Sequence, residues 1–472
     1  MDLALSQWKF LSVRARDHGM HAILTVKVSG AAGLSGAAGL AEVLVVDCSD
    51  SMTWPQSKFR AAKNATAAAL RLLPDGTRFA VVKGTHVAEM AYPDTASMPV
   101  AGPDRRAAAQ ERVHGLVASG GTAIGTWLDL SRELLDGQAA PIRHVLLVTD
   151  GKNEHDEQRP LDEVLAACEG RFICDAWGIG DGWNAHELIR IASRLHGKAD
   201  AVREESQLPV AYEKLMRDML AKAIPELRIR VTAMPGAQIR FFKQVYPTEM
   251  DLANSGHPSG DGSVEYTTRA WGDEFRRYHV CLSADPADQL REEDLQLGFV
   301  EVAAGSARLR YPEPVPIVVQ WTDDPVAATR TDRQVDHFDQ CEQLARTVER
   351  AYQAFRSKDR EQARQELGTA VALAHQLRDD RQLRQLARLV DIVDGPAGRV
   401  RLRAELADID FQHLITASTH STYGPDPEPP YDPGDFGSGG STATRSCPDC
   451  DALSPAHAGH CTGCGRGFRE RP

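Results

Sequence analysis

Residues 42–51 read EVLVVDCSDS, and this stretch decides the fold of the first half of the chain. Four consecutive apolar residues are followed directly by carboxylates and hydroxyls. An apolar run of this kind is typical of a strand buried on both faces of a parallel sheet. The pattern returns in three later segments, TRFAVVKG (77–84), RHVLLVTDG (143–151) and RFICDAWGIGDG (171–182).

Helical patterns separate these strands. Apolar residues recur at helical spacing in five segments, at 57–73, 104–118, 123–136, 184–196 and 207–223. Because strands alternate with helices, the sequence predicts a Rossmann-like α/β domain with a mostly parallel sheet. We place this domain at residues 41–223.

Oxygen-bearing side chains stand at the ends of the predicted strands. Asp47, Ser49 and Ser51 share the loop after the first strand, Asp150 ends a later strand, and Thr122 in SGGTAIG precedes a helix. Ligands of open α/β sheets bind beyond the carboxyl ends of the strands. Hard divalent cations prefer oxygen ligands, so these residues predict a site for Mg²⁺ or Mn²⁺.

These segments resemble the von Willebrand factor type A family. DCSDS matches the family's DxSxS motif, and GGTAIGTWL and VTDG match its other metal-site segments in the right order. The resemblance implies a metal-ion-dependent adhesion site in which Ser49, Ser51 and Thr122 offer hydroxyls and Asp47 and Asp150 act directly or through water. Two alternatives remain open: the loop residues cap the following helix, or the site is a degenerate one without metal.

Outside residues 41–223, the hydropathy pattern divides the chain into further segments. Strand-like alternation at 8–28 is followed by a Gly/Ala-rich entry loop, and alternation returns from 224 to 325 with frequent Gly, Pro, Asp and Asn. This predicts a β-sandwich at 224–325 that residues 1–40 join, so that the α/β domain is inserted into it.

Helical spacing returns at 326–422 and predicts a helical bundle. Its expected helices lie at 333–356, 359–377 and 380–393. Residues 423–445 are rich in Pro, Gly, Ser and Asp and predict a disordered linker.

Four cysteines crowd residues 446–472. Two CxxC pairs, separated by ten residues, are formed by Cys447, Cys450, Cys461 and Cys464. Four thiolates in this spacing are typical of a closed structural Zn²⁺ site, and we predict a short zinc ribbon whose fold depends on the metal.

Charge and hydropathy exclude several classes of protein. The 472 residues include 54 Lys and Arg and 66 Asp and Glu, a formal net charge of −12. An acidic chain argues against broad nucleic-acid binding, which needs a basic surface. No run approaches the ~18–20 apolar residues of a membrane span, and the first ten residues do not resemble a signal peptide. We expect a soluble, cytoplasmic protein.

The function predicted from these features is binding rather than catalysis. No GxSxG, HExxH or P-loop motif occurs, and His144, His155 and His186 are expected to be solvated or satisfied in a core. We expect an interaction protein, not an enzyme, whose bound metal accepts an acidic residue of a partner protein.

Two partner classes remain open. The hydroxyl-rich stretch 416–423 and a looser resemblance to intracellular, actinomycete-like proteins favour a partner in Ser/Thr kinase or phosphatase signalling. The alternative is a metal-binding accessory subunit of an AAA+ ATPase that remodels proteins or inserts metals.

Overall fold

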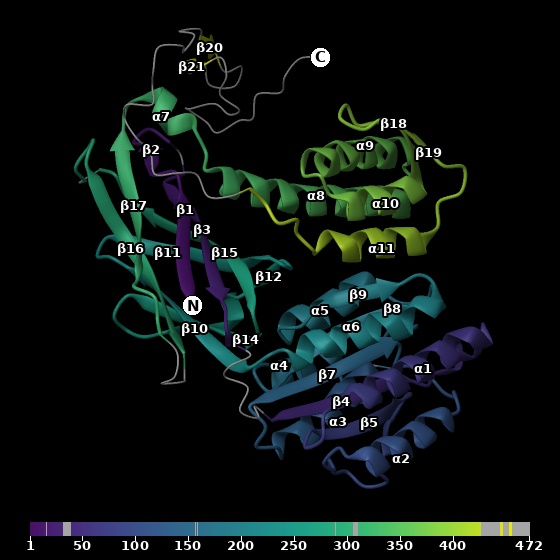
Figure 1. Cartoon of the computed structure of the whole chain (residues 1–472). Coiled ribbons are helices and arrows are strands. Elements are labelled where there is room, and N and C mark those ends of the chain that lie inside the picture. The colour runs from purple at the N-terminus through teal and green to yellow at the C-terminus, as the bar shows by residue number, and fades with distance from the viewer. Residues whose placement is uncertain are drawn as a thin grey trace.

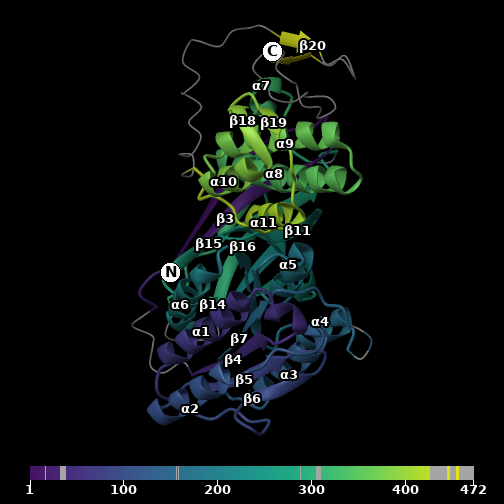
Figure 2. The same cartoon turned by 90° about the vertical axis from the view of Figure 1, so that its right-hand side faces the viewer.

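The computed structural model describes residues 1–425 except 16, 32–38, 156, 158, 288 and 305–309, together with two short segments, 444–446 and 453–455. An α/β domain, a pair of β-sheets and a group of helices make up the described chain (Figure 1). After a turn of 90°, the helices are seen stacked above the α/β domain (Figure 2).

The α/β domain is built around β4 (Leu40–Asp47), whose eight residues are all buried. Its sheet has the order β6-β5-β4-β7-β8-β9, and only the β5–β6 pair is antiparallel. The other strands are β5 (Arg78–Gly84), β6 (Ala88–Tyr92), β7 (Ile142–Thr149), β8 (Ile173–Ile179) and β9 (Ala199–Val202). The predicted Rossmann-like arrangement of this domain is thereby confirmed.

Helices cover both faces of this sheet because side chains along a buried strand alternate between the faces. Val43 and Val45 pack toward the helices α3 (Ile124–Asp136), α4 (Leu161–Cys168) and α5 (Ala185–Arg194). Leu44 and Val46 pack toward the helices α1 (Gln56–Leu72), α2 (Pro103–His114) and α6 (Leu208–Leu220).

Two elements of the domain are not predicted by the sequence patterns. The edge strand β6 has the sequence AEMAY, which lacks the β-branched residues that mark strands. The helix α4 has only eight residues, fewer than the ~10–12 over which helical periodicity can be recognised.

Two further sheets enclose a second hydrophobic core. One has the order β1-β3-β15-β11-β12 and the other β13-β14-β10-β16-β17-β2. Their strands are β1 (Asp2–Gln7), β2 (Phe10–Ser12), β3 (Gly19–Val28), β10 (Ile224–Ala233), β11 (Ala237–Tyr246), β12 (Met250–Asp251), β13 (Gly256–Pro258), β14 (Ser263–Trp271), β15 (Glu274–Ala284), β16 (Asp294–Ala304) and β17 (Val315–Thr322).

The N-terminal strands belong to these sheets. β3 pairs antiparallel with β15, and β2 pairs parallel with β17. The α/β domain therefore lies in the sequence between β3 and β10, which both belong to this pair of sheets. The sequence pattern predicts strands at 8–28, and the structure differs from this in two ways. The first strand, β1, already begins at Asp2. A turn in which the Ala15 amide donates to the Ser12 carbonyl interrupts the expected alternation.

The helical part matches the prediction through its first two helices. Its helices are α7 (Pro325–Thr329), α8 (Arg333–Arg356), α9 (Arg360–Gln376), α10 (Asp380–Leu389) and α11 (Asp408–Ser418). The helix expected at 380–393 ends at Leu389, because the next residues form a hairpin of β18 (Val390–Asp394) and β19 (Arg399–Leu402). β-Branched Val390, Ile392 and Val393 favour the strand.

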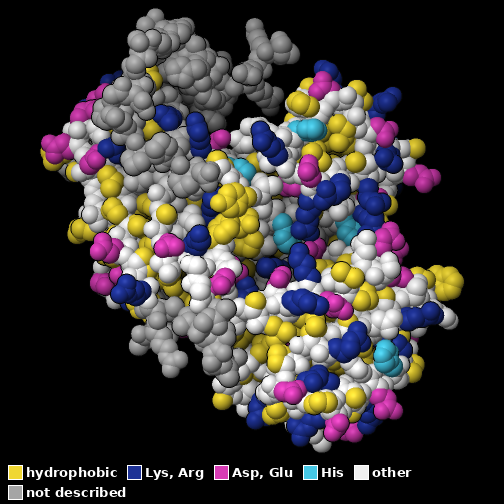
Figure 3. Space-filling view, viewed as in Figure 1, with side chains coloured by type: hydrophobic (Ala, Val, Ile, Leu, Met, Phe, Trp, Pro, Cys, Tyr) yellow, Lys and Arg dark blue, Asp and Glu magenta, His cyan; other side chains and the backbone are white. Residues whose placement is uncertain are grey.

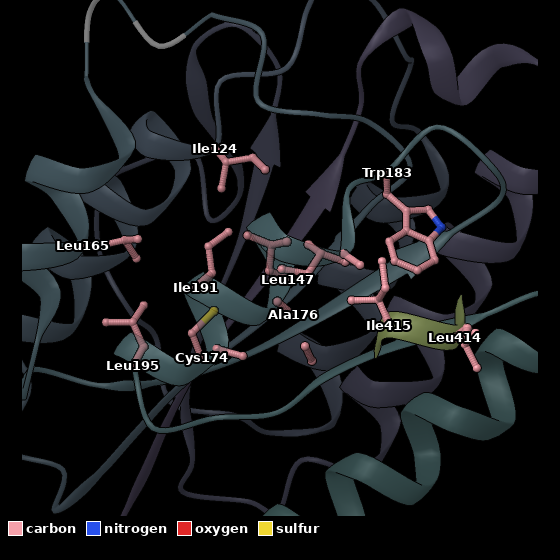
Figure 4. Close-up of a cluster of buried hydrophobic side chains, with 14 of the residues drawn as sticks. Ile124, Leu147, Leu165, Cys174, Ala176, Trp183, Ile191, Leu195, Leu414 and Ile415 are labelled. Carbon is pink, nitrogen blue, oxygen red and sulfur yellow. The ribbon is translucent and has the colours of Figure 1, made fainter. Parts of the chain in front are cut away.

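The helix α11 joins the bundle to the α/β domain. Leu414 and Ile415 belong to the same buried cluster as Leu147 and Trp183 of the α/β domain (Figure 4). The Gln412 side-chain oxygen accepts a hydrogen bond of 2.8 Å from the first amide of α5, at Ala185. Packing of this kind couples the position of α11 to the loop before α5.

Other sequence predictions concern the end of the chain. Most of the predicted linker and all four predicted zinc ligands lie outside the described residues. Within the hydroxyl-rich stretch, Thr416 is buried and its hydroxyl bonds to the Gln412 carbonyl. No helix in the described ranges has the length and apolar character needed to cross a membrane.

Candidate metal site

The site begins at Asp47, the last residue of β4. Its carboxylate is fully buried and accepts two hydrogen bonds, from the Ser49 amide at 2.8 Å and from the Thr149 hydroxyl at 2.6 Å. Burial raises the pKa of Asp47 to about 6, with repulsion from Asp150 acting in the same direction and the hydrogen bonds from Ser49 and Thr149 opposing both. A cation beside Asp47 would relieve this desolvated negative charge.

The two serine hydroxyls of the loop point toward each other. Ser49 Oγ and Ser51 Oγ are 2.9 Å apart, and Ser51 Oγ donates to Asp150 Oδ1 at 2.6 Å. Neighbouring ligands of an octahedral ion with metal–oxygen distances of about 2.1 Å lie about 3.0 Å apart. The spacing of the hydroxyls therefore fits adjacent positions around Mg²⁺.

Thr122 reaches the same place from the loop before α3. A Cβ added to Gly151 would lie 2.9 Å from Thr122 Oγ1 and 3.6 Å from Ser51 Oγ, so the two hydroxyls face the same side of this glycine. The loop is fixed by the Glu154 and His155 amides, which donate to the Thr122 carbonyl. All five residues predicted from the sequence thus gather at the carboxyl edge of the sheet.

Lys58 is part of the site, and the sequence patterns do not predict it. Its ammonium pairs with Asp150 Oδ2, and the two side chains are only 4 % and 1 % exposed. Lys58 lies in the first turn of α1, where the helix dipole disfavours a cation. An unfavourable position of this kind indicates that the lysine has a carboxylate partner, but it does not identify which carboxylate.

The site keeps an excess of negative charge. Asp47 and Asp150 contribute −2 and Lys58 contributes +1. Asp47 and Asp150 each accept two hydrogen bonds, one on each carboxylate oxygen, so every one of these oxygens keeps a lone pair that a cation could use. The residues present fit a hard dication, which their hydroxyl and carboxylate oxygens would hold.

A second charged network lies deeper in the same sheet. His144 Nδ1 is 2.9 Å from both Glu42 carboxylate oxygens, and His144 Nε2 is 3.2 Å from Asp175 Oδ2. Burial alone would lower the pKa of His144, but the Glu42 charge, followed by the hydrogen bonds that the ring donates to Asp175 and Glu42, raises it to about 10. His144 is therefore a core residue whose ring nitrogens both have partners. It is not one of the candidate metal ligands.

Comparisons with known proteins identify the domain and then the family. A family model described as von Willebrand factor type A domain matches residues 41–201. The solved structure of a von Willebrand factor type A protein from Catenulispora acidiphila is 31 % identical, with a TM-score of 0.81, and the match covers 89 % of this chain and 96 % of that one. The chain belongs to the von Willebrand factor type A family, which confirms the resemblance.

Two other proteins show weaker similarity. The ArnB paralog VWA2 from Sulfolobus acidocaldarius is 13 % identical with a TM-score of 0.51 over 88 % of this chain and 97 % of that one, which shows a shared fold. An uncharacterized protein of Synechocystis sp. is 27 % identical over 288 residues, 59 % of this chain. The match spans 65 % of the length of that bacterial relative.

Gly151→Ala tests the arrangement of the site. The added Cβ would enter the space between the Thr122 and Ser51 hydroxyls, so we expect Mg²⁺ affinity to fall at least tenfold while the fold is kept. Isothermal calorimetry with Mg²⁺ measures this. Gly102→Ala is the matched control, because a Cβ there meets nothing within 4 Å. Equal Mg²⁺ affinity in both variants would place the ion elsewhere.

Proposed function

We propose that this protein captures a partner protein through a divalent cation, Mg²⁺ or Mn²⁺, held by Asp47, Ser49, Ser51, Thr122 and Asp150. The observation that carries the proposal is the gathering of these oxygens around Gly151 at one edge of the sheet. The bound dication would supply an exchangeable position that an acidic side chain of the partner can occupy. The role is binding rather than catalysis.

The surroundings of the site support contact with a protein. Trp54, three residues after Ser51, is 82 % exposed. Val87 and Val117, in the loops that follow β5 and α2, are 43 % and 71 % exposed. The Asp50 amide donates to the Gly120 carbonyl, which ties the loop before Trp54 to the loop after Val117. Exposed tryptophan is the residue type most enriched in binding hot spots.

Partner capture provides the test. The full-length chain is used as bait in extracts of the source organism, with Mg²⁺ or with EDTA. EDTA and Asp47→Ala are both expected to abolish capture, and Trp54→Ala is expected to weaken it roughly tenfold or more without changing Mg²⁺ affinity. Capture that survives EDTA and Asp47→Ala would overturn the metal-bridged mechanism.

The captured protein also decides between the two partner classes. A Ser/Thr kinase or phosphatase would support the signalling role, and an AAA+ ATPase would support the accessory-subunit role. The cytoplasm as the place of the interaction and the zinc ribbon as a tethered second contact remain parts of the proposal that rest on the sequence.

A further inference from the structure

A cavity of about 770 Å³ lies where the three parts of the chain meet. The α/β domain contributes β8, β9 and α6, the sheets contribute β12, β14 and β15, and the helical part contributes Arg381 and His420. The space-filling view shows a hollow at this junction with basic side chains around it (Figure 3). Its volume is within the ~300–1,000 Å³ range of small-molecule sites, and its lining does not include the candidate metal ligands.

The lining carries more positive than negative charge. Its cations are Lys198, Lys214, Lys222, Arg269, Arg276 and Arg381, and its acids are Asp175, Asp200, Asp218 and Glu274. Six cations against four acids leave a formal charge of +2. Three of the acids are already paired within the protein, with His144, Arg381 and the Lys222–Arg276 couple.

Two buried donors in this lining lack an acceptor. Trp177 Nε1 and Arg269 Nε have no hydrogen-bond partner within the described part of the chain. The nearest carboxylate to Arg269 is Glu226, at 3.8 Å from Nη1, which is too long for a hydrogen bond. A buried donor without an acceptor is energetically unfavourable. A ligand that supplied acceptors here would remove this penalty.

The backbone of the cavity is strained at Ala270, whose φ of 49° is a value that non-glycine residues rarely adopt. His196, with φ 57°, is the left-handed residue that ends α5, where the Gly197 amide donates to the Ala192 carbonyl. His196 also lies in the field of two guanidinium groups, since burial and then Arg269 and Arg276 lower its pKa to about 4. Strain of this kind gathers at ligand sites, where the surrounding structure maintains it.

Part of the cavity wall is apolar. Leu215 and Met219 of α6 and Met250 and Leu252 near β12 line it, and all four are nearly buried. A ligand that fills the cavity therefore needs an apolar part beside these side chains and acceptor atoms beside Trp177 and Arg269. Inorganic anions meet only the second requirement, and alcohols of hydrocarbon chains meet mainly the first.

We propose that this cavity binds a small organic anion in which a phosphate or carboxylate is joined to an apolar chain or ring. Arg269 donates to the anionic group, Trp177 Nε1 offers a second donor in the same lining, Lys214 adds charge at the rim, and the α6 side chains contact the apolar part. Because residues of all three parts touch such a ligand, its binding stabilises their present arrangement by mass action.

Calorimetric titration of the full-length chain tests the proposal with four probes: octyl phosphate, octanoate, inorganic phosphate and 1-octanol. We expect octyl phosphate or octanoate to bind at least tenfold more tightly than inorganic phosphate and 1-octanol. The stronger of the two anions identifies the headgroup. Failure of both to bind at millimolar concentration overturns the proposal.

Variants locate the binding. Arg269→Gln is expected to weaken it at least tenfold and Trp177→Phe several-fold, while Mg²⁺ affinity stays unchanged. Lys214→Gln changes an exposed rim residue, so it keeps the test valid if a buried variant fails to fold, and it is expected to weaken binding about threefold. Arg364→Gln, on the exposed face of α9, is the matched control. Binding that Arg269→Gln and Lys214→Gln leave unchanged overturns the assignment to this cavity.

Discussion

Replacing Lys58 with methionine is expected to destabilise the metal-free protein by about 3–5 kcal/mol, the usual cost of removing one partner of a buried ion pair. Methionine keeps the apolar stem of the side chain but removes the ammonium from Asp150, which is 1 % exposed. The remaining carboxylate keeps only the hydrogen bond from the Ser51 hydroxyl. Denaturant unfolding in EDTA measures the loss.

Mg²⁺ should restore much of the stability that Lys58→Met loses. A bound dication supplies the positive charge that Asp150 lacks, and the repulsion between the ion and the ammonium is gone. Addition of millimolar Mg²⁺ should therefore raise the free energy of unfolding more in the variant than in the wild type. This difference distinguishes a charge-compensating Lys58 from one that acts only by packing.

Arg60→Met is the matched control, because Arg60 lies on the same helix with an exposed side chain. We expect its stability to stay within about 0.5 kcal/mol of wild type, with the wild-type response to Mg²⁺. The hypothesis fails if Lys58→Met behaves like this control in EDTA, or if Mg²⁺ stabilises the variant and the wild type equally.

Lys58 also shows where sequence reasoning reaches its limit at the site. Ser49 and Ser51 could be predicted because the motif places both hydroxyls in one loop, and Asp150 because strand ends share an edge of the sheet. The partner of Asp150 could not, since a lysine seven residues after Ser51 can face solvent or the site. Only the packing of α1 on the sheet turns it inward.

The fold was predictable where periodicity is strong and local. Buried strands such as β4 and β7 could be predicted from their runs of apolar residues. The helix α8 could be predicted from the helical spacing of its apolar residues over 24 residues. The hairpin after Leu389 is short and follows a helix without a break, so its residues were assigned to that helix. The cavity between the three parts depends on tertiary packing of distant segments, which a local pattern does not contain.

The second large effect is expected from His144→Leu. This substitution leaves the Glu42 and Asp175 carboxylates buried in the sheet without a cation between them. We expect a loss of about 3–5 kcal/mol at pH 7, measured by denaturant unfolding. His155→Leu is the matched control, because His155 is exposed, and it should change stability by less than about 0.5 kcal/mol.

The pH dependence separates the charge of His144 from its packing. The pKa of His144 is raised from 6.5 to about 10 in the folded chain. A raised histidine pKa contributes stability that is fully present below pH 6.5 and is lost as the pH rises through 10, at up to about 1.4 kcal/mol per pH unit. The leucine variant lacks this contribution, so its deficit relative to wild type should shrink between pH 7 and pH 9. A deficit that is equal at both pH values would show that His144 stabilises the sheet by packing and not as a cation between two acids.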